Sequence, residues 1–138
     1  MPDRLLDTNA LAAAMRADAA LERYLLRVGG EGSLFTSVVV EGEVRFGIGR
    51  LPDGRRKKLL TRALDEILAH LGDVLPIHRE AASRYAQLKG DLWKRGKPMG
   101  ENDLWLAAAA VAQDLVLVTN DGSFRNVKGL IVENWLEA

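Results

Sequence analysis

The side chains best suited to chemistry in this chain of 138 residues are four acids: Asp7, Glu43, Asp103 and Asp121. Asp7 directly follows an apolar run that we expect to be a strand, and Asp121 lies in the loop after a second such run. In open parallel sheets, active sites form outside the carboxyl ends of the strands. Both residues also have local interpretations, because Asp7 suits the cap of a following helix and Asp121 with Gly122 suits a turn. Taken singly, each acid is better explained locally.

Glu43 lies on the apolar side of an expected helix. On a helical wheel of about 100° per residue, its neighbours are Val39, Val40, Phe46 and Gly47. An ionised carboxylate on a buried face is costly unless it is paired or binds a metal. The nearby Glu41 falls at the outer margin of this apolar arc, beside Arg45, where it can be solvated. We therefore choose Glu43, and not Glu41, as the candidate.

Asp103 opens an expected helix whose following residues are almost all apolar. Its own face continues through Ala107 and Ala110, which are small enough to let another element approach closely. The alternative is an acid in the first helical turn that is favoured by the helix dipole, with Asn102 as the cap. That alternative explains the residue type but not the apolar surroundings.

Four acids that meet at one point would repel one another, and their pKa values would rise, unless a cation lay among them. The chain has no cysteine and only two histidines, His70 and His78, so carboxylates must hold any metal. This favours Mg²⁺, with Mn²⁺ as a substitute, over zinc. A metal-bound water can attack a phosphodiester while the metal offsets the charge that builds on the phosphate. The sequence offers no Ser-His-Asp set, Walker loop or dinucleotide glycine fingerprint as a competitor.

Short apolar runs alternate with longer stretches of helical spacing along the chain. The expected strands cover residues 4–6, 34–36, 73–77, 115–118 and 131–132. The expected helices cover residues 9–28, 38–48, 55–71, 78–95 and 103–113, the first with or without a break near Asp18. This alternation predicts an α/β fold: one domain over residues 1–138, with a central parallel sheet of four to five short strands and helices on both faces.

The composition, 48% hydrophobic and 28% charged with zero net charge, is that of a globular protein and does not by itself indicate nucleic-acid binding. Basic residues cluster at 55–62 and 89–97, either as solvated helix faces or as RNA contacts. The candidate RNA-binding residues are Arg45, Arg55, Arg56, Lys94 and Arg95. Trp93 is interpreted as a helix anchor, with stacking on a base as the alternative, and Trp105 and Trp135 as core or interface packing. No apolar run approaches the roughly 18 residues of a membrane span, so we expect a cytoplasmic protein.

Four motifs, in this order, resemble the PIN-domain family, and most closely its VapC-type toxins. They are Leu-Leu-Asp-Thr-Asn at 5–9, Glu-Val-Arg-Phe-Gly at 43–47, Gly-Glu-Asn-Asp-Leu-Trp-Leu-Ala-Ala at 100–108 and Val-Thr-Asn-Asp-Gly-Ser-Phe at 118–124. The resemblance runs nearly end to end and supports Glu43 over Glu41. It implies that Asp7, Glu43, Asp103 and Asp121 are the catalytic and metal-binding acids. Thr8, Asn9 and Thr119 are the candidates to support them, and Asp121 is the acid that can reach the metal through a water.

The same resemblance implies a function and partners. It implies divalent-metal-dependent endonucleolytic cleavage of RNA that leaves a 5′-phosphate and a 3′-hydroxyl. It further implies a homodimeric toxin of a type II toxin–antitoxin pair, neutralised by a cognate antitoxin that places a basic side chain in the acidic pocket.

Two other functions compete with this interpretation. A response-regulator receiver domain is also a small α/β protein with an acidic magnesium pocket. It needs paired acids after its first strand, an aspartate after its third and a lysine after its fifth, whereas here the first strand ends in Asp-Thr-Asn and the third in Pro-Ile-His. A PIN-like domain that binds RNA or protein without cutting is the second alternative, and the presence of all four acids argues against it.

Overall fold

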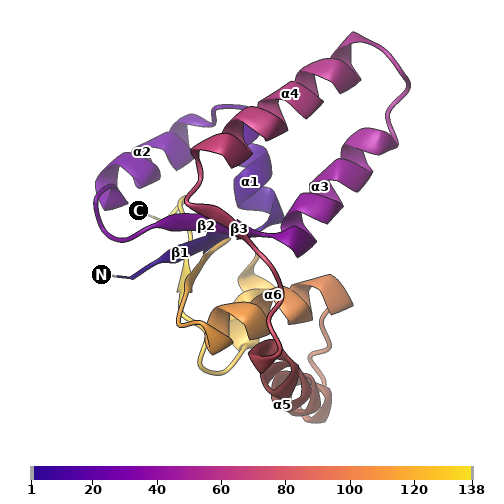
Figure 1. Ribbon diagram of the computed structural model, residues 1–138. Helices are drawn as coiled ribbons and strands as arrows, with labels where there is room; N and C mark the ends of the chain where they lie inside the picture. The colour runs from indigo at the N-terminus through magenta and orange to yellow at the C-terminus, as the bar shows by residue number, and fades with distance from the viewer. Residues whose placement is uncertain (1, 138) are drawn as a thin grey trace.

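Five short strands form one parallel sheet in the computed structural model, which describes residues 2–137 (Figure 1). The strands are β1 (Arg4–Leu6), β2 (Leu34–Ser37), β3 (Asp73–Leu75), β4 (Val116–Val118) and β5 (Val132–Glu133). Their order across the sheet is β3-β2-β1-β4-β5, and every neighbouring pair is parallel. The predicted α/β class with a parallel sheet is therefore confirmed. The edge strand lies at 132–133, one residue later than expected.

Within the described residues, six α-helices accompany the sheet: α1 (Thr8–Met15), α2 (Ala19–Val28), α3 (Val38–Gly49), α4 (Arg55–His70), α5 (Glu80–Lys94) and α6 (Glu101–Ala112). Helices α5 and α6 cover one face of the sheet, and α1 and α2 cover the other (Figure 1). Helices α3 and α4 form a hairpin that extends beyond the sheet (Figure 1). The expected arrangement of helices on both faces is confirmed.

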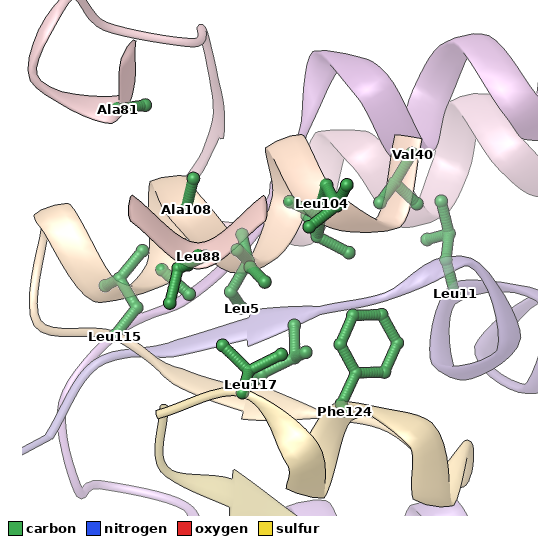
Figure 2. Packing of buried hydrophobic residues seen from close by; sticks show 14 of the residues in the cluster. Leu5, Leu11, Val40, Ala81, Leu88, Leu104, Ala108, Leu115, Leu117 and Phe124 are labelled. Carbon is green, nitrogen blue, oxygen red and sulfur yellow. The ribbon is translucent and has the colours of Figure 1, made fainter. Parts of the chain in front are cut away.

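Alternation along the central strands divides the core between the two faces. Leu5 of β1 lies opposite Leu117 of β4, and both pack into the larger cluster under α5 and α6. The next pair, Leu6 and Val118, packs into the cluster under α1 and α2. Figure 2 shows the larger cluster, in which Phe124 lies near the leucines of the sheet. Successive strand side chains point to opposite faces, so both faces must be covered.

Helix α6 is packed closely because four successive alanines, at 107–110, are buried in it. Small side chains let neighbouring elements approach, and α5 lies directly against α6. The contact includes an aromatic pair, since the rings of Tyr85 and Trp105 stack with centroids 4.0 Å apart. Trp135 is buried in the smaller cluster. The core-packing interpretation of Trp105 and Trp135 agrees with these contacts.

Several expected element boundaries were wrong for identifiable reasons. The stretch 9–28 is two helices, because Ala17 has a φ of 52° and the Asp18 side chain caps α2 by accepting from the Leu21 N–H at 3.0 Å. Helix α6 begins at Glu101 after Gly100, so Asn102 is not its cap. A short 3₁₀ helix over Gly122–Asn126 was not expected. None of the helices described between residues 2 and 137 combines the length and apolarity that crossing a bilayer requires.

Candidate active site

The strand order reverses beside β1, and this is where the site forms. From β1 the chain adds β2 and β3 on one side and later returns to add β4 and β5 on the other. Asp7 follows β1 directly, and its N–H donates to the carbonyl of Val118, the last residue of β4, at 3.1 Å. Asp121 comes three residues after that strand. The loops after β1 and β4 diverge at such a reversal and leave a crevice at the carboxyl edge of the sheet.

Helices α3 and α6 bring the other two acids to the same edge. Helix α3 begins immediately after β2, since the Ser37 hydroxyl caps it by accepting from the Val39 N–H at 3.1 Å. Helix α6 leads into the parallel strand β4, so its first turn also lies at the carboxyl edge. As a result, Glu43 and Asp103 line one cavity of about 320 Å³ together with Gly100, Glu101 and Asn102.

Asp7 is the most deeply buried of the four acids, with 4% of its surface exposed. Its Oδ1 accepts from the Ala10 N–H at 2.8 Å and caps α1, so the local interpretation of this residue is also correct. Burial raises the pKa of Asp7 to about 6, against the lowering effect of hydrogen bonds from Thr119 and Ala10. The charges of Asp103 and Asp121 raise it further. Asp7 is therefore an aspartate that is costly to ionise unless a cation neutralises it.

Asp103 is half-buried in the first turn of α6. Burial raises the pKa of this carboxyl group, and the charges of Glu43 and Asp121 add to the rise. Asp7 and Asp103 thus each sense the charge of two other acids, and together these effects link all four carboxylates. The four predicted acids converge, although they come from positions 7 to 121 of the chain.

Glu43 is held by Thr8, whose hydroxyl donates to Glu43 Oε1 at 2.8 Å. The buried arc of α3 consists of Val40, Val44 and Ile48, and Glu43 lies at its edge, half-buried. The predicted arc was partly wrong, because Phe46 is 68% exposed and Gly47 is exposed. Glu41 pairs with Arg45 at 2.6 Å, as its place on the wheel suggested.

Asp121 is half-buried at the start of the 3₁₀ helix. Its Oδ1 accepts from the N–H and the hydroxyl of Ser123, at 2.9 and 2.8 Å. Thr119 orients the loop, since its Oγ1 accepts from the Asp121 N–H at 3.0 Å. Asn9 donates to the side-chain oxygen of Asn120 at 2.9 Å and so connects α1 to the same loop. The three predicted supporting residues, Thr8, Asn9 and Thr119, each contact an acid or its loop.

The basic candidates fall into two groups. Arg45 is paired with Glu41 and with Asp65, at 2.6 and 3.0 Å. Arg95 is paired with Asp91 at 2.6 Å and also donates to the carbonyl of Asn126. These two cations stabilise contacts within the protein.

The other three basic candidates are also exposed: Arg55, Arg56 and Lys94. Among them, Arg56 borders a mainly apolar groove of about 450 Å³ between α1, α3 and α4. Glu43 and Thr8 also line this groove, which therefore leads to the acids.

The chemistry of the donors suits a hard divalent cation. Carboxylate oxygens are the ligands that Mg²⁺ prefers, and Mg²⁺ binds through one or two carboxylates while it keeps several waters. Between residues 2 and 137, no three acids, histidines or cysteines are drawn into a ready-made metal cage. Of the four predicted acids, Glu43 and Asp103 line the cavity, so a divalent cation bound there would keep waters among its ligands. A buried Asp7 with a raised pKa is the feature that a bound cation would relieve.

Two residues at the site were not predicted. Glu101 lines the acid cavity beside Asp103, and a hydrogen bond from Lys89 at 2.6 Å lowers the pKa of this carboxyl group. Asn120 connects the Asp121 loop to Asn9. Both lie inside the motifs at 100–108 and 118–124 and could have been selected for their polar side chains next to the chosen acids.

A parallel sheet with acids gathered at its strand reversal is the arrangement expected of a PIN fold, and the chain belongs to the PIN domain family, whose model matches residues 4–130. It is similar to a VapC ribonuclease of Sinorhizobium fredii, with 33% identity over 95% of this chain and 96% of the relative.

Two solved structures extend the comparison. The crystal structure of VapBC2 from Rickettsia felis bound to a DNA fragment from their promoter has a TM-score of 0.87, 26% identity and coverage of 96% of this chain and 98% of that chain. The second is the crystal structure of VapBC-5 from Mycobacterium tuberculosis, a member of the VapBC family of toxin-antitoxin systems. Its TM-score is 0.72 and its identity 27%, and the match covers 97% of this chain and 98% of that chain. The resemblance to VapC-type proteins is confirmed.

Proposed function

We propose that this chain is the endoribonuclease toxin of a toxin–antitoxin pair and that Mg²⁺ or Mn²⁺, held by Asp7, Glu43 and Asp103, serves its reaction. The convergence of four carboxylates on the carboxyl edge of the sheet is the observation that carries this proposal. The ribonuclease activity named for the S. fredii relative, which spans nearly the whole chain, supports it. Asp121 completes the negative charge from the loop after β4.

Each protein group has a definable task in this function. Asp7 must lose its proton to act as a ligand, and its raised pKa makes this step the one most dependent on pH. Thr8 holds Glu43 through the hydrogen bond at 2.8 Å, which fixes which carboxylate oxygen is free to face the cavity. Asp103 faces the cavity from the first turn of α6. When bound, the cation supplies an acidified water for attack and offsets charge on the phosphate.

The partner proposal follows from the same charges. An acidic cavity attracts an arginine or lysine side chain as readily as a metal, and an antitoxin that inserts one would block the site. The apolar groove between α1, α3 and α4 lies beside Glu43 and offers a place for an apolar segment of such a partner. The VapBC relatives support an antitoxin partner for this chain. We further propose that the toxin is a homodimer and acts on RNA in the cytoplasm.

Cleavage of RNA by the purified, antitoxin-free protein tests this function. We expect labelled single-stranded RNA to be cut in Mn²⁺ or Mg²⁺ to products with 5′-phosphates, and not in EDTA. Asp7→Asn and Asp103→Asn should each abolish cutting. Asp53→Asn is the matched control, because Asp53 lies in an exposed ion pair with Lys57 and lines neither the acid cavity nor the groove beside Glu43.

Three other outcomes would contradict the proposal. Cutting that persists unchanged in Asp7→Asn would exclude the acids as the active site. RNA or antitoxin-like peptide binding without any cutting would indicate a non-catalytic PIN domain. Transfer of phosphate from acetyl phosphate to the protein would indicate a receiver domain.

A further inference from the structure

We propose that a small aromatic pocket between the end of α5 and the start of α6 binds one unpaired nucleobase of the RNA, next to the phosphodiester that is cut. Trp93 is its stacking platform. The inference rests on the proposed ribonuclease function and adds to it a residue that determines where on an RNA strand the enzyme acts.

The pocket has a volume of about 200 Å³ and is lined by Lys89, Leu92, Trp93, Pro98, Met99 and Glu101, with Leu104 at its base. Its volume is below the roughly 300–1,000 Å³ of pockets that enclose whole small molecules, so a single flat ring system suits it better than a larger ligand. The walls are mainly apolar, and their polar groups come from the Lys89–Glu101 ion pair.

Trp93 is not the helix anchor that the sequence suggested. Its surface is 76% exposed at the end of α5, whereas Leu92 beside it is buried and provides the anchor. An exposed indole in a pocket wall offers a free aromatic face. Aromatic side chains bind single-stranded nucleic acid by stacking on unpaired bases, and every base has a face that can stack.

The pocket adjoins the acid cavity through a shared residue. Glu101 lines both, and Asp103 follows it by two residues in the first turn of α6. A base in the pocket would therefore place its own backbone phosphate, or the neighbouring one, beside the carboxylates. Phe46 is also exposed, but it lies on the α3–α4 hairpin, where the Arg50 guanidinium lies over its ring, 5.7 Å from the centroid.

The wall between the two cavities is held firmly. Lys89 donates to Glu101 at 2.6 Å and to the Tyr85 hydroxyl at 3.0 Å, and the Tyr85 hydroxyl also bonds to Glu101. The Tyr85 ring stacks on Trp105 of α6. These contacts fix the start of α6 against α5, so the pocket is preformed, which lowers the entropic cost of binding a base.

Charge around the pocket suits an RNA strand. Lys94 follows Trp93 directly and is exposed, and Lys97 lies in the loop that also supplies Pro98 and Met99. Cations near a stacking platform attract the phosphates on either side of the bound base. A second copy of this chain or an antitoxin could also cover an exposed tryptophan, and the test below distinguishes these occupants.

The experiment combines substitutions at Trp93 with abasic RNA. An RNA that the wild type cuts in Mn²⁺ is used to measure KM and kcat for Trp93→Ala and Trp93→Phe. Leu26→Ala is the matched control, because Leu26 is 82% exposed on α2, over the other face of the sheet. We expect Trp93→Ala to raise KM about 10- to 100-fold with kcat changed only a few-fold, Trp93→Phe to keep most of the affinity, and Leu26→Ala to behave as wild type.

Abasic nucleotides then identify the base. Each position flanking the cut is replaced in turn by an abasic nucleotide. At one position, the abasic nucleotide should raise the KM of the wild type by the same factor as the Trp93→Ala substitution does. The same nucleotide should leave the KM of the Trp93→Ala protein unchanged. An unchanged KM in Trp93→Ala, or equal sensitivity of both proteins at every position, would overturn the proposal. A change of oligomeric state in Trp93→Ala, measured by light scattering, or a loss of antitoxin affinity alone would also overturn it, since the pocket would then be a protein interface.

Failure of the ribonuclease function remains distinguishable. Binding of fluorescent single-stranded RNA is measured by anisotropy in the Asp7→Asn background, with and without Trp93→Ala. If the wild type cuts no RNA but RNA binding still depends on Trp93, the proposed ribonuclease function is wrong and Trp93 is still an RNA-binding residue. If the wild type cuts RNA but Trp93→Ala changes neither RNA binding nor KM, the ribonuclease function is confirmed and the proposed nucleobase pocket is wrong.

Discussion

Asp7→Asn should stabilise the metal-free protein while it removes activity. In the wild type, burial and the charges of Asp103 and Asp121 raise the pKa of Asp7 to about 6, so above that pH the folded protein carries an ionised carboxylate in an unfavourable place. Asparagine has the same shape and no charge. Its Oδ1 can still accept from the Ala10 N–H and cap α1. The substitution therefore removes the cost and keeps the cap.

The size of the effect follows from the pKa. The rise in the pKa of Asp7 from 3.8 to about 6 corresponds to a free-energy difference of about 3 kcal/mol between its two protonation states. The protonated form of Asp7 stabilises the fold fully below pH 3.8, and this contribution is lost as the pH rises through about 6. The free energy of unfolding of Asp7→Asn should thus equal that of the wild type near pH 4 and exceed it by about 2–3 kcal/mol near pH 7.5.

Urea unfolding of both proteins in EDTA, at fixed protein concentration and at several pH values, measures this difference. Asp53→Asn is the control for loss of a surface carboxylate and should stay within about 0.5 kcal/mol of the wild type at every pH. An Asp7→Asn protein that is less stable than the wild type at pH 7.5, or a difference that does not depend on pH, would refute the reasoning. Either result would mean that Asp7 acts as a helix cap and that ionising its carboxyl group costs little.

Three further predictions follow from other contacts. Thr8→Val removes the hydroxyl that holds Glu43 and should lower RNA cleavage about 10- to 100-fold with little change in melting temperature; unchanged cleavage would exclude a positioning role. Because ligation needs ionised Asp7, cleavage at limiting Mn²⁺ should rise between about pH 5 and pH 7, and a flat pH–rate profile would contradict this. Glu133→Ala removes the closest partner of the buried Arg4, whose Nε lies 2.8 Å from Glu133 Oε1. We expect the free energy of unfolding, measured with urea, to fall by about 2–3 kcal/mol, less than for a fully buried pair because Glu133 is partly exposed. A loss below about 0.5 kcal/mol would contradict this expectation.

The elements and the acids at their ends were predictable because their signals are local. A strand as short as β1 is recognisable from its apolar residues, and an acid directly after it lies at the strand's carboxyl end whatever the rest of the chain does. Helix α6 was recognisable from its apolar and alanine-rich residues. Once the sheet is parallel, topology alone brings Asp7 and Asp121 to one edge.

The errors arise where long-range contacts decide. A helical wheel treats all sides of α3 alike, but the hairpin with α4 leaves Phe46 in solvent. Val40 and Val44, which were on the predicted arc, are buried, and so is Ile48. Arg45 was chosen as a cation for RNA, and its partner Asp65 lies twenty residues away on α4.

Trp93 shows the same limit of sequence reasoning. Its exposure depends on how the end of α5 meets the loop at 96–100, which periodicity does not encode.

Binding of Mn²⁺ to the antitoxin-free protein, measured by titration calorimetry near pH 7.5, tests the central claim most directly. We predict that Mn²⁺ binds saturably to the wild type and to Asp53→Asn. We predict that Glu43→Gln and Asp103→Asn each lose this binding, because Glu43 and Asp103, sixty positions apart in the sequence, line one cavity and would bind the same ion. No binding to the wild type, or equal binding to all four proteins, would contradict the claim that these carboxylates form a metal site.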